Sequence, residues 1–558
     1  MVALSTYVDR GEQEAAKFIQ ERLVQKTVKF HDVLKKQRLH TFAAQAAVRK
    51  VTTVKQKTLT IKAERNLLGK LLVLGQSHGL CLDKIFTYPL AAIPWSLATA
   101  DGCLCKTNKA QLLHVIEKDV MTETAEVVPS HTIVVDGNAL FHAVVKLPRT
   151  FGEFARTVFN HLPKSVPVHF VTDSYHTQSI KEGERRRRGS AGTHVIGGGQ
   201  TKLPSDFKKF LHSSENKKQL ISFILREWQQ AAYAADLQCR DVYYVCEENC
   251  CLLTSVDGKT VSCETVPQLA SNHEEADTRI ILHCVYAAQT SSAVTVRSPD
   301  TDVLVLLVAK CRLVSAALLF ETGTGNNRRI LNVHRIADSL GEDVCTALPG
   351  LHAFTGCDST SAFVRKGKKG PYKLMKNSPV YVNTFAQLGA VAVNVSPEVL
   401  TNLEKFVCAM YGWSSQSSVN KVRAAMFQAR YGVKTARSLS ATSSGGTDLS
   451  LLPPCRRSLV KHCLRANFQA YIWRQSNVNF THLPSPSTCG WTVEDDGIMD
   501  IDWFDGDAIP DSLCDILADS GDKSDDDVEA EFLDEHEDDL VDNIIDAVFE
   551  DEDEEQFD

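Results

Sequence analysis

The chain has 558 residues, with 61 Lys and Arg against 69 Asp and Glu, 43% hydrophobic residues and 23% charged residues. These proportions are ordinary for a globular protein and exclude collagenous, wholly disordered and small disulfide-rich classes. The longest wholly apolar run is Val303–Ala309, whereas a membrane span needs about 20 such residues. We therefore expect no membrane partner and a soluble protein of the nucleus or cytoplasm.

The modest net charge of −8 conceals a strong separation of charge along the chain. The segment from Asp515 to Asp558 contains 22 acidic residues and a single basic residue, Lys523, which leaves 60 basic and 47 acidic residues in 1–514. So acidic a segment cannot bury enough apolar surface to fold, so residues 513–558 are predicted to be a disordered tail. We interpret the tail either as solubilising or as a segment that competes with nucleic acid for the basic body or recruits a protein partner.

The region before residue 129 gives few functional signals. Apolar residues recur at helical spacing over 11–35, which predicts a helix. Residues 50–128 mix short strand-like and helical runs, and we assign no chemistry to them. We treat 1–128 as a mostly helical N-terminal region.

From Thr132 the pattern changes to short apolar runs that each lead to an aspartate. Residues 132–136, 168–173 and 293–300 end in Asp136, Asp173 and Asp300, with helical stretches between them. This alternation is typical of an α/β domain with a mostly parallel sheet. Because functional groups gather beyond the carboxyl ends of parallel strands, we expect the three aspartates to converge.

The rest of the chain divides at changes in composition. Residues 174–240 hold a basic, glycine-rich insert followed by a helix, and a strand and hairpin follow over 241–262. The chain is then predicted to be mainly helical over 381–512, interrupted by a Ser-rich linker at 438–449.

Acidic residues cluster around these strand ends and further along the chain. Glu274, Glu275 and Asp277 lie together, Asp300 and Asp302 are two residues apart, and Asp358 follows Gly356-Cys357. Hard divalent cations need several oxygen ligands, and a pair of such ions needs a crowd of carboxylates. Spacing alone leaves open whether Glu274 or Glu275 acts with Asp277, because the former suits a continuous helix.

The order of these motifs resembles the flap-endonuclease family of PIN-like nucleases. The resemblance covers roughly residues 130–375 and rests on strand–Asp136, strand–Asp173 with a following basic stretch, Glu275-Ala-Asp277, Asp300-Thr-Asp302 and Gly356-Cys-Asp358. It implies a three-layer α/β/α PIN-like domain over 129–380 and selects Glu275 over Glu274. It also implies two Mg²⁺ or Mn²⁺ ions held by a catalytic set of seven carboxylates: Asp136, Asp173, Glu275, Asp277, Asp300, Asp302 and Asp358.

The same resemblance implies contacts to nucleic acid, with structured DNA expected rather than RNA. The segment after Asp358 corresponds to a helix-turn-helix element that grips duplex backbone, and the basic insert corresponds to an arch. The implied contact residues are Lys181, Arg185, Arg186, Arg187, Arg188, Arg297, Arg365, Lys366, Gly367, Lys368, Lys369, Gly370 and Lys373. The alternatives are a basic surface turn after Asp358 and, in the insert, a solvated charge run or a nuclear-import signal.

The sequence thus supports a metal-dependent, structure-selective nuclease that hydrolyses phosphodiester bonds of DNA or RNA with two metal ions. A second interpretation is a catalytically silent nucleic-acid-binding or scaffold protein on the same fold, because about 130 residues precede Asp136, whereas the family begins almost at its first aspartate. The N-terminal region and Leu452–Trp491 resemble a poorly characterised group of animal proteins, which suggests a mobile-element origin. A third is that these aspartates only end strands and cap helices.

Overall fold

The structure is a computed structural model that divides into two compact units, residues 1–47 and 48–558. It describes residues 15–27, 49–54, 57–62, 81–120, 132–176, 179–187, 192–238, 240–323, 325–431, 449–493 and 499–513. The predicted acidic tail beyond Leu513 and almost all of the Ser-rich linker lie outside these residues. In the first unit, residues 15–19 are helical and lead into a π-helical turn, η1 (Gln20–Val24).

The described N-terminal part of the second unit contains both strands and helices. Strands β1 (Arg49–Val54) and β2 (Lys57–Lys62) form an antiparallel hairpin that is rich in β-branched Val, Thr and Ile residues. Residues of this kind favour a pleated strand. The helices α5 (Leu82–Ile85) and α6 (Ala110–Val120) follow.

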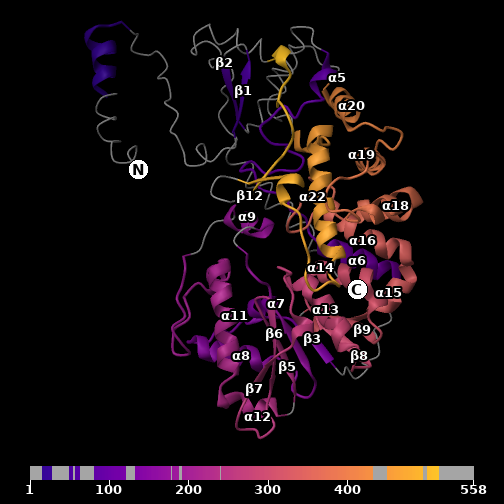
Figure 1. The fold of residues 1–558 in the computed structure, drawn as a ribbon. Coiled ribbons are helices and arrows are strands. Elements are labelled where there is room, and N and C mark those ends of the chain that lie inside the picture. The colour runs from indigo at the N-terminus through magenta and orange to yellow at the C-terminus, as the bar shows by residue number, and fades with distance from the viewer. Residues whose placement is uncertain are drawn as a thin grey trace, which may run out of the picture. The chain divides into compact units, whose positions relative to one another are not determined.

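An eight-stranded sheet forms the centre of the fold, in the order β10-β9-β8-β3-β4-β5-β6-β7 (Figure 1). The pairings from β9 through β8, β3 and β4 to β5 are parallel, and the β10, β6 and β7 pairings are antiparallel. This confirms an α/β protein with a mostly parallel sheet. The strands are β3 (Thr132–Asp136), β4 (Val168–Val171), β5 (Val242–Cys246), β6 (Asn249–Thr254), β7 (Ser262–Thr265), β8 (Ala293–Arg297), β9 (Ala317–Thr322) and β10 (Arg329–Asn332).

Helices cover both faces of this sheet. On one face, α8 (Phe151–Asn160) and α11 (Ser214–Trp228) bury Phe154 and Trp228 against Phe170 of β4. On the other, α13 (Ala276–Ala287) and α14 (Thr301–Lys310) share a core with Val134 of β3 and Val296 of β8. The strands are apolar on both faces because both are buried, as is usual for parallel sheets.

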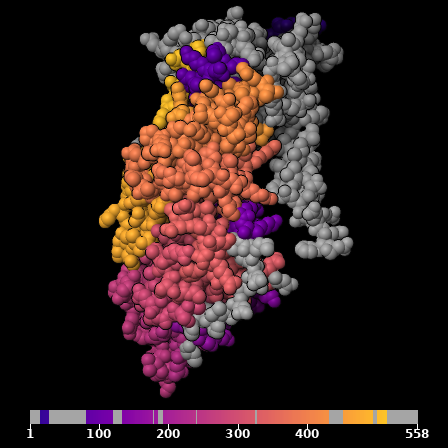
Figure 2. All heavy atoms as spheres, turned by 90° about the vertical axis from the view of Figure 1, so that its right-hand side faces the viewer, coloured from indigo at the N-terminus to yellow at the C-terminus, as the bar shows by residue number. Residues whose placement is uncertain are grey.

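A helical region continues the second of these cores. It consists of α15 (Val333–Leu340), α16 (Glu342–Phe354), α17 (Lys369–Lys376), α18 (Pro379–Gln387), α19 (Pro397–Met410), α20 (Val419–Tyr431) and α22 (Arg456–Arg474). Helix α16 packs against α14, α18 and α22. In Figure 2 the orange atoms of this region border directly on the atoms of the sheet region. No helix in the described ranges is long and apolar enough to span a bilayer.

Gly356 makes the turn that leads from α16 to Asp358. Its φ is +105°, and a Cβ atom there would lie 2.7 Å from the Cα and N atoms of Ala362. A side chain at this position is therefore both strained and blocked by backbone. Gly370, in the first turn of α17, has no atom within 4 Å of such a Cβ.

We predict that Gly356→Ala lowers the free energy of unfolding by roughly 2–4 kcal/mol, because strain and overpacking add. Gly370→Ala should be neutral or slightly stabilising, since alanine is the better helix former. Chemical denaturation of both variants measures the difference. Equal stability of the two variants would show that the turn at Gly356 tolerates a side chain.

Candidate metal centre

The carboxyl ends of β3, β4 and β8 lie at the point where the strand order of the sheet reverses. The chain proceeds from β3 to β4 on one side and later returns to place β8 on the other side of β3. Asp136 is the last residue of β3, and Asp173 and Asp300 follow β4 and β8 within three residues. Ligand sites of open α/β sheets occur at such a switch point.

Asp136 is held by two hydrogen bonds. Its Oδ1 accepts from the backbone N–H of Ala139, at 2.9 Å, and so caps the short helix α7 (Gly137–Ala143). Its Oδ2 accepts from the Ser298 hydroxyl, also at 2.9 Å. Asp136 therefore both caps a helix and lies at the candidate site.

Helix α13 is tied to the end of β4. Asp173 Oδ1 accepts from the backbone N–H of Ala276, the first residue of α13, at 2.8 Å. Arg279, wholly buried in the same helix, donates to the carbonyl of His273 at 2.7 Å and to the Ser174 hydroxyl at 3.0 Å. These bonds fix the segment that carries Glu275 and Asp277.

Glu274 and Glu275 have different surroundings. Glu274 accepts a hydrogen bond from the Ser179 hydroxyl at 2.7 Å. Glu275 is the N-cap residue of α13 and lies within electrostatic range of Asp173 and Asp302. Glu275 thus interacts electrostatically with two of the predicted carboxylates, and Glu274 pairs with a serine.

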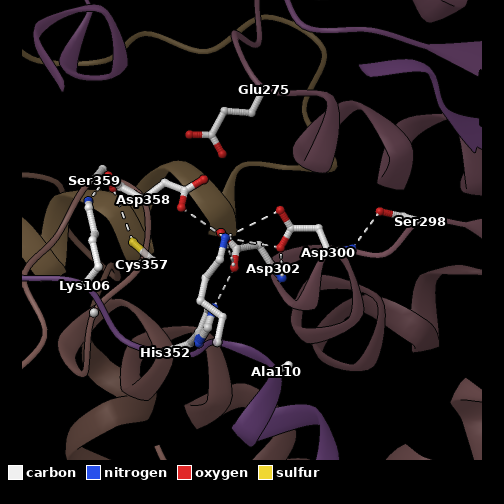
Figure 3. A network of polar contacts seen from close by, with 12 residues as sticks. Lys106, Ala110, Glu275, Ser298, Asp300, Asp302, His352, Cys357, Asp358 and Ser359 are labelled. Carbon is white, nitrogen blue, oxygen red and sulfur yellow. Dashed lines mark hydrogen bonds and ion pairs between the residues drawn. The ribbon is translucent and has the colours of Figure 1, made fainter. Parts of the chain in front are cut away.

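Three carboxylates come closest together. Asp277, Asp300 and Asp302 each offer an oxygen, and these oxygens all lie within 4.8 Å of one another. Asp300 caps α14 by accepting from the Asp302 backbone N–H at 2.9 Å. In Figure 3 the carboxylates of Asp300, Asp302 and Asp358 turn toward one another, although Asp358 comes from the loop after α16.

Two lysine ammonium groups neutralise part of this charge. Lys109 Nζ lies 3.3 Å from Asp300 Oδ1, 3.2 Å from Asp302 Oδ1 and 3.1 Å from Asp358 Oδ1. Lys181 Nζ lies 3.0 Å from Glu275 Oε1. Helix N-termini add positive potential, because Glu275 and Asp300 occupy the N-cap positions of α13 and α14.

Burial and mutual repulsion shift the pKa values of several carboxyls upward. Burial, assisted by Asp173, raises the pKa of Asp136 to about 6, and burial with the charge of Asp302 raises that of Asp300 to about 7. Burial and Asp300 raise the pKa of Asp277 well above its ordinary value. A carboxylate with a raised pKa gains most from a bound cation.

Asp302 behaves in the opposite way. Burial alone would raise its pKa, but Lys109 and His352 hold it below the ordinary value. His352 Nε2 lies 2.8 Å from Asp302 Oδ1, and both side chains are almost wholly buried. Burial and Lys368 lower the pKa of His352 to about 4, so the imidazole is neutral at pH 7 and donates its Nε2–H to Asp302.

The site has the chemistry of a hard-cation centre. Its closest ligands are carboxylate oxygens, which suit Mg²⁺ and Mn²⁺, and the triad contains no thiolate or imidazole of the kind that zinc and copper prefer. Among the described residues, the cationic groups near Asp136, Asp277 and Asp300 do not offset the rise in the pKa values of these carboxyls. A divalent cation would supply the remaining positive charge, so the residues present fit such an ion.

The basic residues after Asp358 separate into exposed and buried ones. Arg365, Lys369 and Lys373 are exposed, and the Lys366 ammonium lies 3.9 Å from the ring centroid of Tyr411. In the predicted segment after Asp358, residues 364–368 form a turn that leads into α17, whereas α16 ends before Asp358. The turn contains Gly367 at a φ of +55°, and Gly370 lies in the first turn of α17.

Lys368 differs from its predicted place at the surface. Its side chain is buried, and Nζ donates to the His352 carbonyl at 2.8 Å, to the Thr355 hydroxyl at 2.9 Å and to the Gly356 carbonyl. These acceptors draw the ammonium inward, so in this arrangement it supports the turn before Asp358 and does not face a phosphate.

The remaining predicted contact residues are described only in part. Arg297 is half-buried, and its Nε lies 2.9 Å from Glu321 Oε1. Arg185, Arg186 and Arg187 fall in α9 (Ile180–Arg187), but their side chains lie outside the described residues, as does all of Arg188. Their roles stay predictions.

Sequence reasoning missed Lys109 and His352. Lys109 belongs to the stretch to which the sequence analysis assigns no chemistry, and His352 belongs to none of the acidic motifs. His352 is buried, and its partner is Asp302. Nothing in their spacing signals a link, since Lys109 and His352 are far from Asp302 in the chain.

No family model and no curated protein matches the chain. The fold and the site therefore define its class by themselves: an α/β protein with an eight-stranded, mostly parallel sheet and a buried group of three aspartates that could hold a metal ion.

We predict opposite stability effects for two neutral substitutions in the metal-free protein at pH 8. Asp277→Asn should stabilise by roughly 1–3 kcal/mol, because it removes a carboxyl whose pKa burial has raised. Asp302→Asn should destabilise by roughly 2–4 kcal/mol, because Lys109 and His352 lose a buried charged partner. Denaturation in EDTA measures both.

The pH dependence provides a check. The raised pKa of Asp277 means that its cost develops as pH rises above about 4, where the unfolded chain loses that proton. The advantage of Asp277→Asn should therefore shrink toward pH 4. Effects of the same sign for both variants would contradict the assigned electrostatics.

Proposed function

We propose that the protein is a divalent-metal-dependent nuclease that hydrolyses phosphodiester bonds of structured nucleic acid, DNA rather than RNA. The observation that carries this proposal is the close approach of Asp277, Asp300 and Asp302 at the switch point of the sheet. These residues come from two different helix starts, and Asp136, Asp173 and Asp358 end or follow other elements nearby. Such crowding is costly without a cation.

The residues that would hold two Mg²⁺ or Mn²⁺ ions are Asp136, Asp173, Glu275, Asp277, Asp300, Asp302 and Asp358. Bound ions of this kind activate a water molecule and stabilise the negative charge of the leaving oxygen. The resemblance to flap endonucleases supports this assignment, because the acidic motifs occur in the same order and on comparable strand and helix ends.

The remaining polar groups would orient the carboxylates and the substrate. Ser298 fixes Asp136, and neutral His352 fixes Asp302, each through one hydrogen bond. Lys181, beside Glu275, carries a positive charge suited to a nearby phosphate.

Backbone contacts to nucleic acid would come from the turn and helix after Asp358. Lys369 and Lys373 are exposed and lie four residues apart in α17, a spacing that places both cations on one side of the helix, and the exposed Arg365 lies in the turn before it. Phosphate contacts of this kind provide affinity and register rather than sequence recognition. The excess of basic residues in 1–514 supports a polyanionic substrate.

Cleavage assays with labelled flap, hairpin, duplex and single-stranded DNA and RNA test the proposal. We predict cutting in Mg²⁺ or Mn²⁺ that EDTA abolishes and that Asp300→Asn/Asp302→Asn reduces at least about 1,000-fold, the equivalent of several kcal/mol. Asp338→Asn removes an exposed carboxylate that pairs with Arg312 at 2.6 Å, and it should leave the rate unchanged.

A catalytically silent nucleic-acid binder is the second candidate, favoured by the ammonium of Lys109 among three of the carboxylates. Binding without cutting, both by the whole chain and by a chain that ends at Leu513, would support this second candidate. Cutting only by the shortened chain would identify the acidic tail as an inhibitor of the nuclease.

A further inference from the structure

Lys109 is presented to the carboxylates by a fixed backbone. It immediately precedes α6, whose start Asn108 caps by accepting from the Ala110 backbone N–H at 3.0 Å. Leu112 and Ile116 of α6 are wholly buried, and the helix packs on α14, α15 and α17. The neighbouring Lys106 donates to the backbone carbonyl of Asp358 at 2.9 Å. The position of Lys109 therefore follows from the core.

The Lys109 ammonium contacts the same oxygens that a cation would use. Asp300 and Asp302 belong to the triad whose oxygens lie within 4.8 Å of one another, and their Oδ1 atoms are 3.3 and 3.2 Å from Nζ. A divalent ion binds carboxylate oxygens at about 2.0–2.2 Å. An ion on these two oxygens would thus lie within a few ångströms of an ammonium, where like charges repel strongly.

We infer that Lys109 is a built-in counter-ion of the metal centre, whose ammonium neutralises Asp300, Asp302 and Asp358 without metal and is displaced when a divalent cation binds them. The inference rests on the proposed function, because it assumes that the carboxylates bind metal. It assigns the region before Asp136 a role in that site: Lys109 stabilises the metal-free protein and weakens metal binding.

The side chain has room for this displacement. Lys109 is 22% exposed and Asp358 is 47% exposed, whereas Asp302 is only 2% exposed. The centre is therefore in contact with solvent at Lys109 and Asp358. Its four-carbon stem can move the ammonium into water while the backbone of α6 stays in place.

Calorimetric titration of the whole chain with Mn²⁺ alone tests the inference. Lys109→Met should bind Mn²⁺ about tenfold more tightly than the unchanged protein, within the range usual for coupled sites. In EDTA the variant should unfold at a lower temperature, because three carboxylates lose their common partner. Lys118→Met, an exposed position on the same helix, should change neither quantity.

A measurement on the unchanged protein keeps the inference testable should Lys109→Met not fold without metal. Amine acetylation read by mass spectrometry should label Lys109 slowly in EDTA and several-fold faster in Mn²⁺, while Lys118 labels equally in both. Unchanged labelling of Lys109 would overturn the inference.

The outcomes separate the two levels of the argument. If both Lys109→Met and the unchanged protein bind Mn²⁺ with equal affinity, the counter-ion role is wrong and the metal centre stands. If neither protein binds Mn²⁺, the proposed function fails and the inference fails with it. Weaker binding by Lys109→Met would show that the ammonium supports the ion, which also overturns the inference.

Discussion

Repulsion among buried carboxylates is the constraint on which the site depends. Asp277, Asp300 and Asp302 share a small volume, and burial there favours protonation. The fold opposes this repulsion with two lysine ammonium groups, with the N-termini of α13 and α14 and with hydrogen bonds from Ser298 and His352. These groups do not fully neutralise Asp136 and Asp277, whose pKa values stay raised. We propose that a metal ion supplies the remaining positive charge.

The hydrophobic core holds the helices that carry the site residues. Helices α13 and α14 begin at the carboxylates and continue into the largest hydrophobic core, so the packing of Val134, Ile280 and Leu304 also sets the positions of the acidic side chains. Carboxylates placed on such rigid elements cannot easily move apart to relieve their repulsion. Neutralising cations are therefore needed to hold the arrangement.

The region before Asp136 belongs to the site, although the resemblance to flap endonucleases does not extend there. Lys106 and Lys109 reach Asp358 and the triad from the segment that precedes α6. The resemblance assigns no role to this region, whereas the structure places two of its lysines beside the carboxylates. In the counter-ion role that we propose for Lys109, its positive charge makes metal binding depend on the N-terminal region.

The sequence by itself determined the separation of charge, the α/β class and the mostly parallel sheet, because strands that end in Asp136 and Asp173 have local patterns of apolar residues. The resemblance placed Asp277, Asp300 and Asp302 in one set with four further carboxylates. Only the tertiary structure shows that the oxygens of these three lie within 4.8 Å of one another, that Lys368 is buried, and that Lys109 and His352 contact the carboxylates. These contacts join residues far apart in the chain, so no periodicity or spacing encodes them; they arise from helix packing around the shared core.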